Sequence, residues 1–600
     1  MKITPNALTI NQLFSSANEQ FVIPAYQRRY SWRERQISEL IDDIELTEAG
    51  DTHLLGSIVC LTGQHTAGLN QLELVDGQQR LTTITILLEC IRERLERDGE
   101  KDAVTDLTRL LAAKALGGPA ARKVVLDSID AEEFERLLKQ KGAQDGAKYQ
   151  NEHLEAAFGI VRDWLEERDL IEVGGFLYKL QNLALIIRLD VGDAKDAFKL
   201  FETINNRGLK LSPTDIIKNF VLGNAARFGR AQLEDARLSW AKLVAKLDGT
   251  DSDAFFRYYL ISVLKRRVTK SQVVPEFKWL FMNEVVEAAG LPDRHLYRDD
   301  EGDDEDDEGE DVAVQGSLEE DVELELEKKA SIDFKDFVES LVKCATAFGE
   351  LVLIKTGDKR IDRHLRHLRM IKSAQTYGFL MHLRVAGVAP KVFVEVLKMT
   401  ESFVLRRHVC KERANETEAL FARLCSVDPL DPVADVRAAY REASPSDEKF
   451  RDDFAAINFT PNIIDRARYC LEQIELRSLG KYEELQVLGS EAVHVEHIIP
   501  QKIKTKKAKD EFGDWVTYLG ERAELQHPKY VSRIGNLTVF AGTLNIGASN
   551  NPFAKKKVAY KASSIQLTAK LAELPSFKFK HVEERSRELA QLAVQLWPLP

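Results

Sequence analysis

The sequence predicts a multidomain α+β protein that is mostly helical. Six hundred residues are too many for one hydrophobic core, so several domains are expected. Strand-like apolar runs gather in the first third, and long amphipathic helical patterns follow them. A second short group of strand and turn motifs lies near the C-terminus. We therefore expect an α/β domain at 1–225, a helical bridge at 226–480, and a C-terminal domain of helices around a small finger at 481–600.

The first third alternates strand and helix patterns. Strands are predicted at 21–24, 54–61 and 72–75. Ser31 is expected to cap a helix, and a longer helix should follow residue 80. Their buried faces are predicted from apolar spacing: Ile37, Leu40, Ile41 and Ile44 in the first helix, Leu81, Ile84, Leu87, Leu88 and Ile91 in the second.

A turn between the third strand and that longer helix predicts an anion site. It reads Asp76-Gly77-Gln78-Gln79-Arg80. A helix start offers free backbone N–H groups and the positive end of the helix dipole. Gly77 would let a ligand approach closely, and Arg80 could donate two hydrogen bonds to a phosphate. Asp76 could cap the helix or hold Mg²⁺. The sequence contains no Gly-x-x-x-x-Gly-Lys-Ser/Thr motif, which excludes a P-loop nucleotide triphosphatase.

A third motif follows at 194–215. The pattern predicts a helix at 194–204 that ends at Gly208, and a new helix with Ser212 as its cap and Pro213 in its first turn. A helix end explains the glycine but does not require Arg207, so that arginine is a candidate functional residue.

The middle of the chain is predicted to be helical, with an acidic insert near 296–325. Residues 299–311 hold eleven acidic side chains and no base, which favours a disordered linker. Residues 361–369 place bases on one helix face and leucines on another. That basic face could be solvated or could line DNA.

Composition excludes several classes of protein. Six cysteines without a Cys-x-x-Cys pair argue against a zinc ribbon and against a secreted disulfide framework. No apolar run is long enough to span a membrane and no signal core begins the chain, so we expect a cytoplasmic protein. The net charge of −12 does not exclude DNA as a partner, because lysines gather locally near the C-terminus.

The C-terminal motifs predict a one-metal nuclease. Glu496-His497 is followed by Asn536 after thirty-nine positions, and then by Asn545 and Asn550. A neutral imidazole can deprotonate the attacking water, which makes His497 the candidate general base. Mg²⁺ or Mn²⁺ prefers hard oxygen ligands, which Glu496 and Asn545 offer, with Asn550 as the alternative amide. Asn536 is expected to hydrogen-bond backbone and to fix the loop that aims the histidine.

Phosphate binding also needs local positive charge. The run Lys555-Lys556-Lys557 could contact DNA phosphate, or it could be a solvated lysine face.

These motifs together resemble DUF262/DUF1524 proteins of the GmrSD type. Glu-His-Ile-Ile-Pro-Gln, Ile-Gly-Asn-Leu-Thr and Asn-Asn-Pro-Phe at 496–553 resemble an HNH, or ββα-metal, finger. Three motifs at 23–32, 75–83 and 201–215 resemble a DUF262 domain, which is related to the ParB/sulfiredoxin fold. The gap between His497 and Asn536 is longer than in compact HNH fingers, so the metal amide is the weakest part of the match.

The resemblance implies a modification-dependent (type IV) restriction endonuclease that defends a bacterium against phage. It implies binding and hydrolysis of a nucleoside triphosphate, GTP or ATP, at Asp76 to Arg80 with Thr82 and Arg207 nearby. Sensing of modified double-stranded DNA would fall to an aromatic and basic segment: Tyr26, Gln27, Arg28, Arg29, Tyr30 and Trp32.

An alternative is a non-catalytic ParB-like sensor of DNA or nucleotide with a degenerate HNH region. The intact Glu496, His497 and asparagines favour the nuclease. The sequence leaves open the DNA modification that is read, the nucleotide used and the oligomeric state, a homodimer included.

Overall fold

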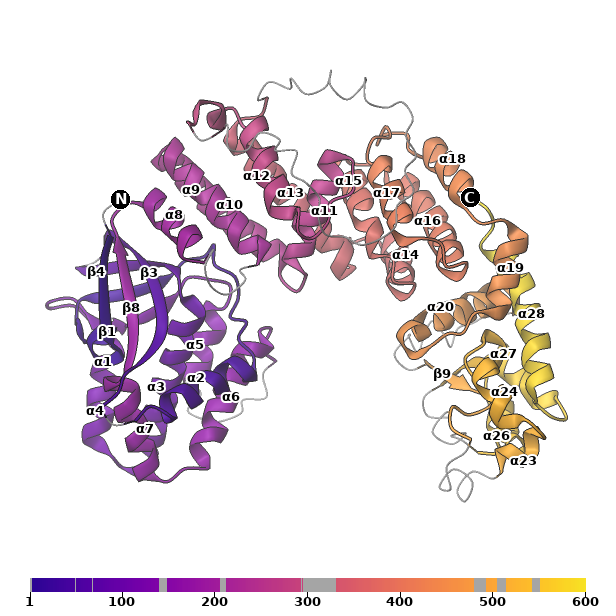
Figure 1. Ribbon diagram of the computed structural model, residues 1–600, viewed down its shortest axis with the longest axis horizontal. Coiled ribbons are helices and arrows are strands. Elements are labelled where there is room, and N and C mark those ends of the chain that lie inside the picture. The colour runs from indigo at the N-terminus through magenta and orange to yellow at the C-terminus, as the bar shows by residue number, and fades with distance from the viewer. Residues whose placement is uncertain are drawn as a thin grey trace. The chain divides into compact units, whose positions relative to one another are not determined.

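A computed structural model describes residues 3–48, 50–66, 68–139, 148–205, 212–292, 294, 331–479, 493–503, 514–541 and 551–600. The chain forms two compact units (Figure 1). The first unit comprises Met1–Arg257 and Thr269–Thr346, and the second comprises Tyr258–Val268 and Ala347–Pro600. Each unit carries one of the two groups of motifs.

A mixed six-stranded sheet forms the centre of the first unit. Its strands lie in the order β1-β8-β3-β4-β2-β7. β3 pairs parallel to β8 and antiparallel to β4, while β2 pairs parallel to both β4 and β7. The strand bounds are β1 (Ile3–Thr9), β2 (Glu19–Ile23), β3 (His53–Thr66), β4 (Leu69–Asp76), β7 (Val124–Leu126) and β8 (Ala184–Val191).

Helices cover this sheet and share one apolar core with it. The core combines inward residues of the strands with the apolar faces of helices such as α2, whose Ile37, Leu40, Ile41 and Ile44 are buried. Burying these faces supplies the main driving force for the fold. The helices are α1 (Ile10–Ser15), α2 (Glu34–Glu45), α3 (Gln78–Asp98), α4 (Lys101–Leu110), α5 (Ala131–Lys139), α6 (Glu152–Glu166) and α7 (Leu170–Asn182). A small two-stranded sheet, β5 (Ala112–Lys114) and β6 (Ala120–Arg122), lies among them.

A run of helices follows the last strand of the sheet. α9 begins as predicted, with Ser212 as its cap and Pro213 in its first turn. The helices from this point are α8 (Ala194–Asn205), α9 (Pro213–Phe228), α10 (Arg230–Leu247), α11 (Ser252–Leu264), α12 (Val273–Glu284) and α13 (Phe334–Leu353).

In its described residues, the second unit is helical except for a pair of antiparallel strands. Its strands are β9 (Val493–His497) and β10 (Leu537–Ala541). The helices before them are α14 (Lys359–Met370), α15 (Tyr377–Val385), α16 (Pro390–Val409), α17 (Ala414–Leu424), α18 (Val433–Ala443), α19 (Asp447–Ala456) and α20 (Ile464–Ile474). The helices after β9 are α23 (Trp515–Leu519), α24 (Ala523–Tyr530), α26 (Phe553–Lys561), α27 (Gln566–Ala569) and α28 (Phe579–Leu596).

The mostly helical α+β class with a sheet near the N-terminus is confirmed. One local prediction is wrong: Arg33, not Ser31, is the residue that precedes α2. The Ser31 amide instead donates to the side chain of Gln79, 2.7 Å away, so Ser31 is held by a different helix. The acidic insert and Arg207 lie outside the described residues.

The six cysteines are buried and form no disulfide. No helix in the described ranges is long and apolar enough to cross a bilayer.

Candidate functional site

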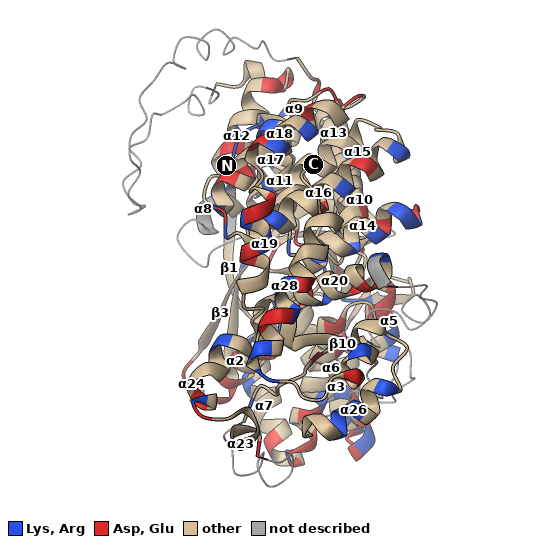
Figure 2. Cartoon of the chain, turned by 90° about the vertical axis from the view of Figure 1, so that its right-hand side faces the viewer, with Lys and Arg blue, Asp and Glu red and all other residues tan. Residues whose placement is uncertain are grey.

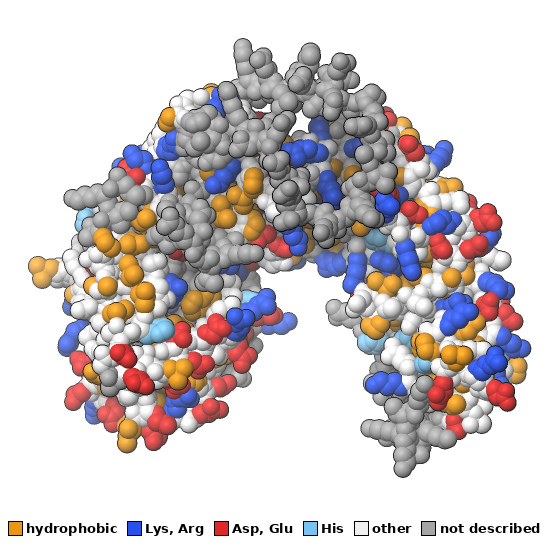
Figure 3. All heavy atoms as spheres, viewed as in Figure 1, with side chains coloured by type: hydrophobic (Ala, Val, Ile, Leu, Met, Phe, Trp, Pro, Cys, Tyr) orange, Lys and Arg blue, Asp and Glu red, His pale blue; other side chains and the backbone are white. Residues whose placement is uncertain are grey.

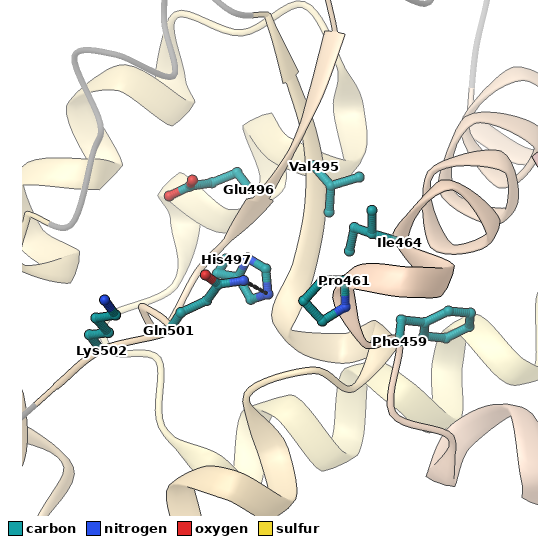
Figure 4. A pocket seen from close by; sticks show the side chains of 8 residues that line it. All are labelled: Phe459, Pro461, Ile464, Val495, Glu496, His497, Gln501 and Lys502. Carbon is teal, nitrogen blue, oxygen red and sulfur yellow. Dashed lines mark hydrogen bonds between the residues drawn. The ribbon is translucent and has the colours of Figure 1, made fainter. Parts of the chain in front are cut away.

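The C-terminal motifs meet in the antiparallel pair of strands β9 and β10. The two strands are antiparallel, with His497 opposite Leu537 and Glu496 opposite Thr538. Side chains alternate along a strand, so Val495 and His497 share one side of β9 and Glu496 points to the other (Figure 4). The pairing brings the Glu-His motif to within one residue of Asn536, although thirty-nine positions separate His497 and Asn536 in the sequence.

Asn536 fixes the loop that follows His497. Its side chain is fully buried. The amide Nδ2 donates to the carbonyls of Ile499, at 2.9 Å, and Val531, at 2.8 Å, and Oδ1 accepts from the Ile499 amide at 2.8 Å. Because one side chain satisfies three buried backbone groups, the loop has one defined conformation next to the histidine.

The glycine of the same motif is required by close packing. A Cβ at Gly535 would lie 2.8 Å from the backbone nitrogen of Ser586 in α28, and closer still to the carbonyl oxygen of Val582. The Gly535 amide donates to Ser586 Oγ at 3.0 Å. The long C-terminal helix therefore lies directly against the loop that carries Asn536.

A cavity of about 540 Å³ lies beside the end of β9. His497 lines it together with Glu496 and Gln501, and apolar residues from the segment before α20 form another wall (Figure 4). The Gln501 amide nitrogen lies 3.3 Å from His497 Nε2. Burial, followed by the charges of Lys556 and His527, lowers the pKa of His497 to about 4. The imidazole is therefore neutral at pH 7, the state that a general base needs.

Glu496 is paired with a lysine of α26. The Lys556 ammonium contacts Glu496 Oε1 and donates to the His497 carbonyl oxygen at 2.8 Å. Both side chains are buried, and Lys556 is fully so. Burial raises the pKa of Glu496, while the charge of Lys556 acts in the opposite direction. This lysine carries the positive charge that a buried carboxylate needs.

The predicted metal ligands are described only in part. Glu496 offers one carboxylate beside the cavity, whereas Asn545 and Asn550 lie outside the described residues. In the described part of the chain, the oxygen donors at this cavity therefore do not complete a ligand set for Mg²⁺ or Mn²⁺. Glu496 would contribute to such a site only with donors from the residues not described.

The lysine run divides into two kinds of position. Lys555 and Lys557 are accessible to solvent, whereas Lys556, between them, is buried against Glu496. A direct contact between Lys556 and DNA phosphate is therefore not supported by its placement. Acidic and basic side chains are interspersed along the described helices (Figures 2 and 3).

A second cavity, of about 820 Å³, lies in the first unit where β4 meets α3. Its lining includes residues of α2, among them Arg35, Glu39 and Asp43, and residues of β3 and α8. It also includes residues of the two N-terminal motifs and of the segment around α9: Gln27, Arg28, Ser31, Trp32, Asp76, Gly77, Gln78, Gln79, Arg80, Ser212, Asp215 and Lys218. The sequence-predicted turn and the aromatic-basic segment are thus parts of one site.

Gly77 and Arg80 shape the helix start. Gly77 precedes α3 with φ of 87°, and a Cβ there would lie 2.5 Å from Ile58 Cγ2. Only glycine fits both the left-handed conformation and this close approach. Arg80 packs on Gly56 and donates to the Ser57 carbonyl at 2.9 Å. Burial lowers the pKa of Arg80, against the opposing charge of Asp76.

Two glutamines join the motifs. Gln27 Nε2 donates to the carbonyls of Leu74 and Val75, at 3.1 and 2.9 Å, at the end of β4. Gln79 accepts from the Ser31 amide and donates to the Arg29 carbonyl at 3.2 Å. These bonds hold the segment after β2 against the segment after β4.

The sequence reasoning missed Lys218 and the role of Asp215 at this site. Lys218 is buried, and its ammonium donates to Gln27 Oε1 at 2.5 Å and lies 3.6 Å from Asp215 Oδ1. Burial lowers the pKa of Lys218, with Asp215 acting against that change. A buried polar residue on an otherwise apolar helix face was the available signal.

Four residues predicted for the N-terminal site do not line its cavity. Tyr26 donates to Glu73, and Tyr30 shares a hydrogen bond of 2.7 Å with Thr83. Arg29 pairs with Asp130 and Asp248. Thr82 is buried in α3. These four side chains are not among the residues that line the cavity, and their part in sensing or nucleotide binding stays a prediction.

Two family models match the chain. Residues 10–222 match the family model described as GmrSD restriction endonuclease, N-terminal domain. Residues 444–592 match the model described as GmrSD restriction endonucleases, C-terminal domain. No curated protein matches the chain. Since the two matched domains contain the two cavities and together span most of the chain, the protein belongs to the GmrSD family of restriction endonucleases.

Proposed function

We propose that the second unit hydrolyses phosphodiester bonds of DNA with His497 as the general base. One observation carries this assignment: a neutral histidine lines an open cavity, next to a loop that Asn536 fixes. An unprotonated ring nitrogen of His497 would take the proton of the attacking water, and the Gln501 side chain, which contacts Nε2, would orient the ring. The region folds as an HNH finger formed by β9, β10 and α26. Mg²⁺ or Mn²⁺, held by Glu496 and an amide oxygen of Asn545 or Asn550, would stabilise charge on the phosphate.

The experiment compares His497→Ala with His494→Ala. His494 lies three residues before His497 on the same strand and is exposed. Loss of a general base lowers the rate by roughly two to four orders of magnitude. We expect this loss of DNA cleavage in His497→Ala alone. Cleavage within threefold of the parent protein would end the assignment and favour a non-catalytic sensor.

We also propose that the cavity of the first unit binds and hydrolyses a nucleoside triphosphate, GTP or ATP, on a ParB-like domain. Support comes from the helix start at Gly77 and from four basic side chains that line the cavity, Arg28, Arg35, Arg80 and Lys218. Such a site attracts phosphate through N–H groups and charge. Asp76 would hold the nucleotide's Mg²⁺.

Calorimetric titration with each nucleotide tests this site. Asp76→Asn and Lys218→Met should each weaken binding at least tenfold, whereas Lys242→Met, an exposed lysine of α10, should leave it unchanged. Normal affinity in both cavity variants would place the nucleotide elsewhere.

The biological target in this proposal is modified phage DNA, and nucleotide binding controls cleavage. A nuclease that spares host DNA needs a signal from a separate recognition site. Gln27, Arg28 and Trp32, which line the N-terminal cavity, would contribute to sensing. Cleavage of a panel of modified and unmodified DNAs, with and without nucleotide, tests both statements. Equal cleavage in all arms would refute them.

A further inference from the structure

Three side chains of the types that ligate metals are buried together in the second unit, away from β9. His364 and His367 lie on consecutive turns of α14, and Glu401 comes from α16. The sequence predicted α14 as an amphipathic helix with a basic face, and its exposed arginines fit that prediction. The histidines lie on the buried side and have no part in either cavity.

The donor atoms converge. His367 Nδ1 lies 3.1 and 3.2 Å from the two oxygens of Glu401, and His364 Nδ1 contacts Oε1 of the same carboxylate. One ligand atom from each residue falls within 4.8 Å of the others. Ligands of tetrahedral Zn²⁺, at bond lengths of about 2.0–2.1 Å, lie roughly 3.3 Å apart. The two separations of His367 Nδ1 from the carboxylate oxygens are close to that spacing.

The buried Glu401 carboxylate requires positive charge nearby. Within the described ranges its ion-pair contacts are with His364 and His367, and no lysine or arginine forms an ion pair with it. A buried carboxylate without a partner charge is costly. A divalent metal would supply positive charge through the same three donor residues.

Further residues hold the carboxylate and one ring in place. Tyr469 of α20 donates to Glu401 Oε2 at 2.9 Å and accepts from Trp597 Nε1 at 2.9 Å. The Gln473 side-chain nitrogen lies 3.4 Å from His367 Nε2. Outer partners of this kind orient metal ligands. The His367 side chain is 12% exposed, which gives the cluster an opening to solvent.

We propose that His364, His367 and Glu401 form a structural site for Zn²⁺ or a similar divalent transition metal. The site would fasten α14 to α16, and through Tyr469 and Trp597 it would also fasten α20 and the residue that follows α28. Imidazole nitrogens favour such ions over Mg²⁺, so this site differs in kind from the oxygen site proposed at Glu496.

Metal analysis of the full chain tests the site. After exposure to zinc and extensive dialysis, we expect about one zinc ion per chain. His367→Gln and Glu401→Gln should lose that ion. His382→Gln, a half-buried histidine of α15, and Glu496→Gln at the nuclease cavity should both retain it.

A second measurement uses only the parent protein, so it does not require the variants to fold. Replacement of zinc by cobalt in the parent protein should give ligand-field absorption bands of a low-coordinate nitrogen site. Zinc should also raise the Tm, and a chelator should lower it. The proposal is overturned if the parent protein holds no zinc after dialysis, or if both cluster variants keep it. Neither result bears on cleavage, because His497→Ala tests the nuclease independently.

Discussion

Substitution of Asn536 tests how the candidate catalytic loop is held. Asn536→Ala removes the acceptor of the Ile499 amide and the donors to the carbonyls of Ile499 and Val531. Each buried backbone group left without a partner costs about 1–3 kcal/mol, so three groups cost at least about 3 kcal/mol. Asn536→Asp keeps one acceptor but sets a carboxylate against two carbonyl oxygens, and it should be no more stable than the alanine variant.

Hydrogen exchange followed by mass spectrometry measures the loss of local stability in the loop that contains Ile499. A local penalty of about 3 kcal/mol speeds exchange of the Ile499 amide by roughly two orders of magnitude. DNA cleavage should fall with it, because the loop that follows His497 loses its fixed conformation. Gln591→Ala, on the exposed face of α28, serves as the control and should change neither reading. Unchanged protection at Ile499 in Asn536→Ala would refute the argument.

Three further outcomes are expected. Gly535→Ala should destabilise the second unit by about 1–3 kcal/mol, seen as a lower Tm, because the new methyl group meets the backbone of α28. Since the pKa of His497 is lowered to about 4, cleavage should persist from pH 7 to about pH 5 and fall below that; a loss centred near pH 6.5 would contradict it. The unfolded histidine takes up its proton near pH 6.5, so stability should also decline as pH falls from about 6.5 to 4. Lys556→Met should lower the free energy of unfolding by about 3 kcal/mol or more, because it leaves the buried Glu496 carboxylate without its ion-pair partner. The control Lys555→Met should leave the Tm nearly unchanged, because Lys555 is exposed.

Local features of the fold were predictable because their causes lie within a few residues. The cap of α9 at Ser212 and the start of α3 after Gly77 follow from turn chemistry that the sequence displays. The apolar spacing of α2 gives its buried face directly. Ser31 was assigned wrongly as a cap because its amide is bound by Gln79, forty-eight residues away, which no local pattern reveals.

The composition of each site was harder to predict, because it depends on contacts between distant segments. Lys218 contacts Gln27 across 191 positions, so no local pattern shows that α9 lines the N-terminal cavity. The pairing of His364 and His367 with Glu401 was missed for a similar reason. On α14, the exposed arginines dominate the sequence pattern, while the histidines beside them lie on the buried side.

Both cavities place a buried lysine against a carboxylate, Lys218 with Asp215 and Lys556 with Glu496. Burial lowers the pKa of both ammonium groups, and each carboxylate acts in the opposite direction. A charge pair of this kind adds little net stability, but removal of one partner leaves a costly buried charge. Such pairs place opposite charges together at the edge of a cavity. A sequence shows a lysine run or a helical lysine, and only the fold shows which lysine has this role.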